Sequence, residues 1–245
     1  MYNYSFNLLN KQAINILEGE NNMGKIVLIE GTDCSGKETQ SNLLMDKLKK
    51  EGYSVEKIAF PDYECPTGKI IGGPYLGKSY ICNSWFKEGA INVDGKVASL
   101  YFAADRLYHK DQILDAKNKN DLLILDRYTI SNMAHQGGKF ETKEERLAMY
   151  KWLEELEFNL LGLPRPDMVI FLHMPEQVSE ILKKNRKEEL DEHEKSKTYL
   201  SKSERAYLEL SKLYGFKEIL CSIKDQPRQI EDINEDVYKL VKKII

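Results

Sequence analysis

Five short apolar runs recur along the chain and predict β-strands. Each is six to ten residues long, rich in Ile, Val, Leu and Phe, and bounded by Gly, Pro or charged residues. The runs at 25–30, 121–126 and 166–175 are typical of strands that are buried on both faces of a sheet, whereas the run at 53–60 alternates apolar and polar residues. The runs span residues 25–30 (KIVLIE), 53–60 (YSVEKIAF), 121–126 (DLLILD), 166–175 (PDMVIFLHMP) and 217–223 (KEILCSI).

Longer polar stretches with apolar residues at helical spacing separate these runs. After the first run, Leu43, Leu44 and Leu48 lie on one face of an expected helix, which Gly52 ends. Further helices are expected over residues 97–118, 142–161, 176–214 and 230–245. Residues 61–95 are rich in Gly, Pro and Asn and are expected to be mostly irregular. Strands that alternate with helices indicate one α/β domain built on a parallel sheet.

The first 22 residues precede a second methionine, Met23, and the first apolar run follows it at once. We therefore expect a single domain over residues 23–245 and an N-terminal extension over residues 1–22. The extension is interpreted as either an appended helix or an over-assigned start.

Composition narrows the class of protein. Hydrophobic residues make up 42% of the chain, enough for a core, and the formal net charge of −3 gives no sign of a general nucleic-acid surface. The four cysteines, Cys34, Cys65, Cys82 and Cys221, have no C-x-x-C spacing, so a zinc or disulfide framework is not expected. Reduced thiols, with neither a signal peptide nor an apolar run long enough for a membrane span, favour a cytoplasmic protein.

The stretch GTDCSGKETQ, residues 31–40, closely matches the phosphate-binding pattern G-x-x-x-x-G-K-[ST]. It follows an expected strand and opens an expected helix, so its backbone N–H groups and the helix N-terminus can face one phosphate group. Lys37 is the candidate bridge to the terminal phosphates. The candidate ATP-binding residues are Gly31, Asp33, Cys34, Ser35, Gly36, Lys37, Glu38 and Thr39.

Glu38 stands where the pattern has a hydroxyl residue, and Thr39 follows one position late. A carboxylate is a good ligand for a hard cation, so Glu38 could bind magnesium directly. It could equally face solvent, leaving Thr39 and water to take over. The sequence leaves both options open.

Asp126 and Arg127 follow the most apolar strand run, in the segment DRY. The carboxyl ends of parallel strands share one edge, so these side chains are expected to face the phosphate loop. Asp126 suits magnesium, directly or through water. The positive guanidinium group of Arg127 suits the negative charge of phosphate groups.

The chain from about Met23 onward resembles the thymidylate kinase family. The resemblance rests on the order and spacing of six segments: EGTDCSGKETQ, FPDYECPTGKII, FAADRLYH, DRYTISNMAHQGGK, RPDMVIFLHMPEQ and LDEHEKSKTYLSKSERAYLEL. It implies a P-loop kinase fold, with a five-stranded parallel sheet flanked by helices and a mobile lid at about 183–198. It also implies transfer of the γ-phosphoryl group of ATP to dTMP with Mg2+, in nucleotide biosynthesis, by a homodimer.

The resemblance also implies roles for particular residues. Arg127 would span the donor and acceptor phosphates, and Asp33 would contact the 3′-hydroxyl of the acceptor. Phe102 and Arg106 are four residues apart on one helix face, where the family stacks on thymine and bonds its O4. The remaining candidate dTMP-binding residues are Phe60, Ser131, Asn132 and His135.

A basic cluster in the expected lid supplies a third catalytic candidate. Cys34 occupies a position where some members carry an arginine, and members without it supply the charge from the lid. Arg186, with Lys183 or Lys187, is therefore expected to close over ATP.

Some positions depart from the family pattern besides Glu38. Asp62 and Glu64 stand where an arginine often binds the acceptor phosphate, and acidic groups there would repel phosphate unless turned away. His135 replaces a frequent tyrosine that helps to exclude a 2′-hydroxyl, and His173 replaces a frequent aspartate. Two alternatives therefore stay open: a kinase for another nucleoside monophosphate or a deoxynucleoside, or an inactive nucleotide-binding homologue.

Overall fold

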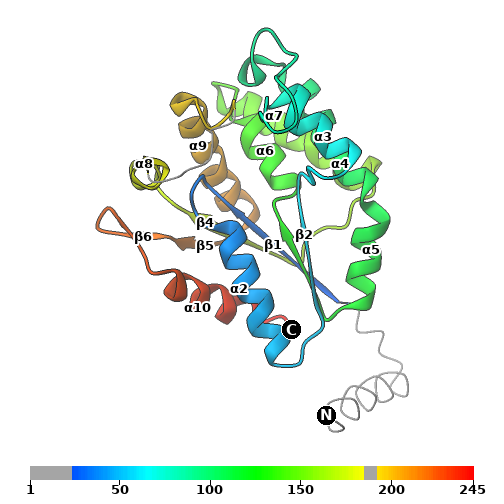
Figure 1. Ribbon diagram of the computed structural model, residues 1–245, viewed down its shortest axis with the longest axis vertical. Coiled ribbons are helices and arrows are strands. Elements are labelled where there is room, and N and C mark those ends of the chain that lie inside the picture. Colours follow the sequence, from blue (N-terminus) through cyan, green and yellow to red (C-terminus); the bar gives the residue numbers. More distant parts are fainter. Residues whose placement is uncertain (1–23, 185–191) are drawn as a thin grey trace.

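The computed structural model describes residues 24–184 and 192–245 (Figure 1). The expected N-terminal extension, residues 1–22, lies outside the described residues. So do Arg186, Lys187 and the middle of the expected lid.

A five-stranded parallel sheet forms the centre of the molecule, as the sequence predicts. Its strands lie in the order β2-β3-β1-β4-β5, and every neighbouring pair is parallel. The strands are β1 (Lys25–Gly31), β2 (Val55–Ala59), β3 (Leu122–Asp126), β4 (Met168–His173) and β5 (Lys217–Leu220). Ile29 pairs with Asp126, so the carboxyl ends of β1 and β3 meet at one edge.

Helices cover both faces of the sheet because successive strand residues point to opposite sides. Ile26 and Leu28 of β1 enter one core, and Val27 and Ile29 enter the other. The first core is covered by α5 (Lys110–Lys119), α6 (Thr129–Gly137), α7 (Lys143–Glu154) and α9 (Lys197–Tyr214). The second core is covered by α2 (Lys37–Lys50), α8 (Glu176–Lys184) and α10 (Ile230–Val241). Figure 1 shows α2 and α10 packed together on their side of the sheet.

A third, smaller core lies under the segment between β2 and α4 (Gly95–Tyr108). The segment was expected to be mostly irregular, but it contains α3 (Pro66–Ile70), a π-helical turn (Ile71–Tyr75) and a 3-10 turn (Ala90–Asn92). The buried ring of Tyr75 packs against Phe86, Tyr101 and Phe102. These aromatic contacts, distant in sequence, order the segment.

Other element boundaries differ from the sequence prediction. The single helix expected over 97–118 is two helices, α4 and α5, because the backbone leaves helical geometry at His109. The strand expected over 217–223 divides into β5 and β6 (Ser222–Ile223), and β6 pairs with β7 (Gln226–Pro227) in a small hairpin. The segment 142–161 is helical as expected, with α7 continuing into a π-helical turn (Glu155–Leu160). Within the described ranges, every helix is too short or too polar to cross a bilayer.

Candidate active site

The phosphate loop after β1 is held in a tight, specific conformation. Cys34 and Gly36 both have left-handed backbone angles, with φ of 57° and 77°. A side chain at Gly31 would approach Ser35 Oγ to 2.4 Å and Leu172 O to 2.6 Å, so the loop needs glycine there. Thr32 Oγ1 donates to Met174 O (2.7 Å) and accepts from Met174 N (2.9 Å), which fixes the loop to the end of β4.

Lys37 lies at the mouth of this loop. Its side chain is buried, and Nζ donates to Gly31 O and Thr32 O, each at 3.0 Å. Burial and the charge of Arg127 lower the pKa of Lys37 to about 8, although the carboxylates of Asp33 and Asp126 oppose them. The nearby carboxylates therefore only partly compensate the Lys37 ammonium charge. A phosphate group on the loop would supply further negative charge beside it.

Asp126 and Arg127 stand beside the loop, at the end of β3, as predicted. Asp126 is buried, with Oδ2 3.4 Å from Ser41 Oγ of α2. Arg127 has a left-handed φ of 63°, which is unfavourable for a non-glycine residue. Burial would lower the pKa of Arg127, but the nearby Tyr207 phenol and the carboxylates of Glu30 and Asp33 raise it. Arg127 therefore stays a cation at any working pH.

Glu30 anchors the DRY segment, a role that the sequence did not reveal. Its fully buried carboxylate accepts from Tyr128 N (2.9 Å), Ser131 N (3.0 Å), Ser131 Oγ (2.7 Å) and Tyr207 Oη (3.0 Å). Burial raises the pKa of Glu30, and the Arg127 charge and these hydrogen bonds only partly oppose that shift. The bonds join β1 to α6 and α9 and hold Arg127 against the loop.

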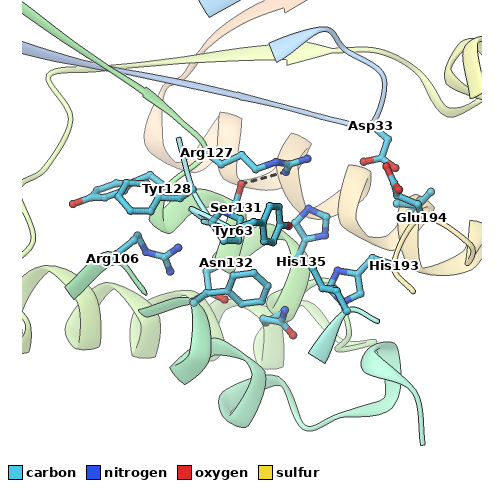
Figure 2. A pocket seen from close by; sticks show the side chains of 16 residues that line it. Asp33, Tyr63, Arg106, Arg127, Tyr128, Ser131, Asn132, His135, His193 and Glu194 are labelled. Atoms are coloured by element: carbon cyan, nitrogen blue, oxygen red, sulfur yellow. Dashed lines mark hydrogen bonds between the residues drawn. The ribbon is translucent and has the colours of Figure 1, made fainter. Parts of the chain in front are cut away.

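A pocket of about 660 Å³, including its open mouth, extends from the phosphate loop toward α4 (Figure 2). All eight candidate dTMP-binding residues line it: Asp33, Phe60, Phe102, Arg106, Arg127, Ser131, Asn132 and His135. The structure therefore brings these eight candidates together on one cavity. We call this cavity the acceptor pocket.

Arg106 and Asn132 form the polar end of the acceptor pocket. Nη2 of Arg106 donates to Glu157 Oε1 (2.7 Å), and Asn132 Nδ2 donates to the same atom (2.9 Å). Asn132 Oδ1 and both polar atoms of the Gln136 amide are buried without a hydrogen-bond partner among the described residues. Buried polar groups of this kind are costly unless a ligand pairs with them. This end of the pocket is thus suited to a ligand with both donors and acceptors.

Two histidines line the pocket wall. The ring of His135 stacks on those of His193 (5.9 Å, 14°) and Tyr199 (5.7 Å, 24°). Burial and the positive charge of Arg127 hold the pKa of His135 well below its usual range, so the ring is neutral near pH 7. Burial likewise lowers the pKa of His193 to about 3. Figure 2 shows the two rings beside one another.

Asp33 belongs to the phosphate loop, lines the acceptor pocket and contacts the end of α8, where the expected lid begins. Its Oδ2 lies 3.0 Å from Lys183 Nζ of α8. Burial would raise the pKa of Asp33, but Lys183, Lys37 and Arg127 lower it to about 2. An anion in the pocket and a phosphate on the loop would therefore meet among three cations. Such an arrangement can support in-line transfer between two phosphates.

The structure shows where the residues that depart from the family pattern lie. Glu38 and Thr39 are exposed in the first turn of α2. Asp62 does not line the acceptor pocket: its Oδ2 faces His109 Nε2 at 3.4 Å, so its charge is turned away. His173 lies between two carboxylates, with Nε2 2.8 Å from Glu204 and Nδ1 3.0 Å from Glu218.

Several pocket residues were not found from the sequence. Gln136 directly follows His135 in a recognised segment, so its place next to a candidate was a usable signal. His193 lies within the expected lid, Leu200 follows it in α9, and Tyr63 comes from the segment expected to be irregular. Nothing in the sequence pointed to Glu157, because an acidic residue in a charged helical stretch normally faces solvent.

Comparison with known proteins gives one consistent result. The thymidylate kinase family model matches residues 29–237. The thymidylate kinase of Schizosaccharomyces pombe is 28% identical over 223 residues, covering 91% of this chain and 94% of the relative. A probable thymidylate kinase of Pyrococcus horikoshii is 31% identical over 226 residues, covering 89% and 96%. A solved thymidylate kinase structure from Candida albicans aligns with a TM-score of 0.67 at 26% identity, covering 90% and 92%.

Proposed function

The chain belongs to the thymidylate kinase family, and from this premise we propose that it transfers the γ-phosphoryl group of ATP to dTMP, giving dTDP and ADP. The observation that carries the proposal is that Asp33 and Arg127 belong to the phosphate-loop region and also line the acceptor pocket. A donor phosphate and an acceptor phosphate can therefore approach one another in line.

The donor triphosphate binds the loop Gly31–Thr39. Main-chain N–H groups and Lys37 hold the β- and γ-phosphates, as in other phosphate loops. Arg127 spans the two reacting phosphates and balances the charge that spreads over the transferred group. Arg186, outside the described residues, closes from the lid as a third catalytic cation. The Lys183–Asp33 ion pair supports this role, because it brings the α8 end of the lid to the loop.

The acceptor dTMP occupies the acceptor pocket. Phe102 stacks on the thymine, and Arg106 donates to its O4, which favours a carbonyl over the amino group of cytosine. Ser131 and Asn132 complete the base-contacting wall with Phe60. Asp33 accepts from the 3′-hydroxyl, and His135 faces the 2′ position of the sugar. Support for these roles comes from the convergence of all these side chains on one cavity.

Asp126 is the principal magnesium site in this proposal. Its buried carboxylate stands beside the phosphate loop, and carboxylate oxygens are preferred ligands of this ion. Glu38 is a second, exposed candidate in the first turn of α2. The ion would neutralise the β- and γ-phosphates during transfer.

We further propose a cytoplasmic homodimer. None of the four cysteines, all within the described ranges, forms a disulfide, which suits a reducing compartment. Val97, Leu100 and Leu107 are exposed by 43%, 51% and 42% on one face of α4. An exposed apolar helix face of this kind is typical of a subunit contact.

A panel of acceptors tests the proposed reaction. Purified enzyme with Mg-ATP is offered dTMP, dUMP, dCMP, AMP and thymidine in turn, and ADP and the phosphorylated product are both measured. We expect the highest kcat/KM with dTMP and no turnover in Lys37→Met. Preference for a different acceptor would identify another nucleotide kinase, and ATP binding without any phosphorylated product would identify an inactive homologue. The Candida albicans enzyme is described as having broad substrate specificity, so each acceptor needs its own kcat and KM.

A further inference from the structure

A second cluster of ligand-type side chains lies outside the acceptor pocket. Asp62, Cys65 and His109 each offer one atom, and the three atoms lie within 4.8 Å of one another. Asp62 follows β2, Cys65 begins α3, and His109 joins α4 to α5. Three separate segments thus bring a carboxylate, a thiol and an imidazole to one point.

The histidine of this cluster is oriented as a ligand. Nδ1 of His109 lies 2.8 Å from the main-chain oxygen of Asp105. A carbonyl oxygen can only accept, so Nδ1 carries the proton, and Nε2 faces Asp62 Oδ2 at 3.4 Å. Two lone-pair atoms at this distance need a cation between them, either a proton on Nε2 or a metal ion. Metal-bound histidines commonly use their other nitrogen in this way.

Asp105 orients the other two residues. Its buried carboxylate accepts from Thr67 Oγ1 (2.6 Å), Cys65 Sγ (3.3 Å) and Asp62 N (3.2 Å). A side chain at Gly68 would lie 1.7 Å from Asp62 O, so α3 packs directly on the Asp62 backbone. These contacts position Asp62 and Cys65 in the metal-free protein. Zinc binding releases the Cys65 proton to solvent, so the bond from Cys65 Sγ to Asp105 is lost, and the thiolate keeps the main-chain donor Gly68 N at 3.3 Å.

The distances fit a tetrahedral ion. Zinc bonds of about 2.0–2.3 Å at tetrahedral angles place ligand atoms about 3.3–3.8 Å apart. The 3.4 Å separation of His109 Nε2 and Asp62 Oδ2 falls in this range. The other two separations are at most 4.8 Å and enter the range if Cys65 Sγ moves inward by up to about 1 Å. Thiolate, imidazole and carboxylate together favour zinc over magnesium. The Asp62 side chain is 41% exposed, so water can reach the ion as a fourth ligand.

We propose that Asp62, Cys65 and His109 form a zinc site that joins the segment after β2 to the α4–α5 junction. The sequence did not indicate this site. Its cysteines have no C-x-x-C spacing, and that spacing was the only zinc signal sought. The Phe60 ring lies edge-on to His109 at 5.6 Å and lines the acceptor pocket. The ion would thus stiffen one wall of that pocket without contacting the reacting groups. This proposal does not depend on the proposed reaction.

Cobalt titration of the full chain tests the site. The protein is freed of metal by chelation, kept in excess Mg2+ without nucleotide, and titrated with Co2+ and then Zn2+. We expect one equivalent of Co2+ to give a thiolate-to-cobalt charge-transfer band in the near ultraviolet, and Zn2+ to abolish it. Absence of this band would overturn the proposal and leave Asp62 and His109 as a simple ion pair.

Matched variants assign the band to these residues. Cys65→Ser should remove it, and Asp62→Asn and His109→Gln should weaken Co2+ binding at least tenfold. Cys82→Ser, which alters another partly buried cysteine, should leave both band and affinity unchanged. Circular dichroism checks that each variant is folded. If Cys65→Ser and His109→Gln unfold, Asp62→Asn still tests the site, because Asp62 is partly exposed and its substitution should be tolerated. A band that survives in folded Cys65→Ser, or unchanged affinity in folded Asp62→Asn, would contradict the assignment.

Discussion

Nη2 of Arg106 lies 2.7 Å from Oε1 of Glu157, and both side chains are almost completely buried. Arg106 lines the acceptor pocket, whereas Glu157 lies outside its lining and contacts Arg106. Glu157 Oε2 also accepts from Arg106 Nε and from Thr129 Oγ1 (3.1 Å). The guanidinium group is therefore held in one orientation, and a side chain far from the recognised motifs determines where Arg106 points.

Glu157→Gln should disturb both stability and acceptor binding. Removing one partner of a buried ion pair leaves the other charge uncompensated, so we expect the free energy of unfolding to fall by about 3 kcal/mol. We also expect the KM for dTMP to rise about tenfold, because Arg106 loses its fixed orientation. Denaturant titration and steady-state kinetics measure the two effects.

Glu209→Gln is the matched control for this change. Glu209 pairs with Arg146 at 2.9 Å, and neither residue lines the acceptor pocket. The control should lower stability and leave the KM for dTMP unchanged. Equal changes in KM for both variants would mean that Glu157 acts only through general destabilisation.

The activity should fall on the alkaline side through loss of the Lys37 charge. Burial and the charge of Arg127 lower the pKa of Lys37 to about 8. Below this pH the ammonium can bind phosphate, and above it the neutral amine cannot. We expect kcat/KM for ATP, which reports the free enzyme, to fall above about pH 8. The limb in kcat should lie at higher pH, because bound phosphates stabilise the ammonium.

A second lysine supplies the control for this pH profile. Burial also lowers the pKa of Lys139 to about 8, but Lys139 Nζ donates to Val93 O (2.7 Å), away from the phosphate loop. Lys139→Met should keep the alkaline limb. Its disappearance in that variant would assign the limb to Lys139.

Asp126→Asn should raise the Mg2+ concentration needed for half-maximal activity at least tenfold, because it removes the buried carboxylate beside the loop. Glu38→Ala should change this concentration less than about twofold, since Glu38 is exposed in the first turn of α2. Activity is measured against Mg2+ at fixed ATP. An effect of Glu38→Ala as large as that of Asp126→Asn would identify Glu38 as a direct ligand.

His173 should stabilise the fold mainly at lower pH. Burial opposes its charge, but the hydrogen bonds and charges of Glu204 and Glu218 raise the pKa of His173 above 6.5. The stabilisation is therefore complete below about pH 6.5 and is lost as the pH rises through the folded-state pKa. We expect His173→Gln to cost about 1–2 kcal/mol at pH 6 and less at pH 9, by urea unfolding. Glu204→Gln should reduce this pH dependence, and a cost that grows with pH would contradict the assignment.

The parts of the fold that follow local rules were predictable from the sequence. Apolar runs gave all five strands of the sheet, and the glycines with Lys37 gave the phosphate loop. The break at His109 was not predictable, because the apolar pattern continues across it and the break depends on contacts with Asp62 and Asp105. Glu30 and Glu157 were also missed. Their roles depend on burial, which tertiary packing decides and a lone acidic residue does not reveal.

His135 should control discrimination against ribonucleotides. Its neutral ring lines the acceptor pocket, and Nδ1 is buried with no hydrogen-bond partner in the described part of the chain. His135→Ala removes this bulk, so we expect the ratio of kcat/KM for dUMP over UMP to fall about tenfold. This pair of acceptors differs only in the 2′-hydroxyl, which separates the sugar effect from that of the thymine methyl group. His135→Tyr should preserve the ratio, because an aromatic ring still fills this position. Because the imidazole is already neutral, the wild-type ratio should stay constant between pH 6 and 8. An unchanged ratio in His135→Ala would place the discrimination elsewhere in the pocket.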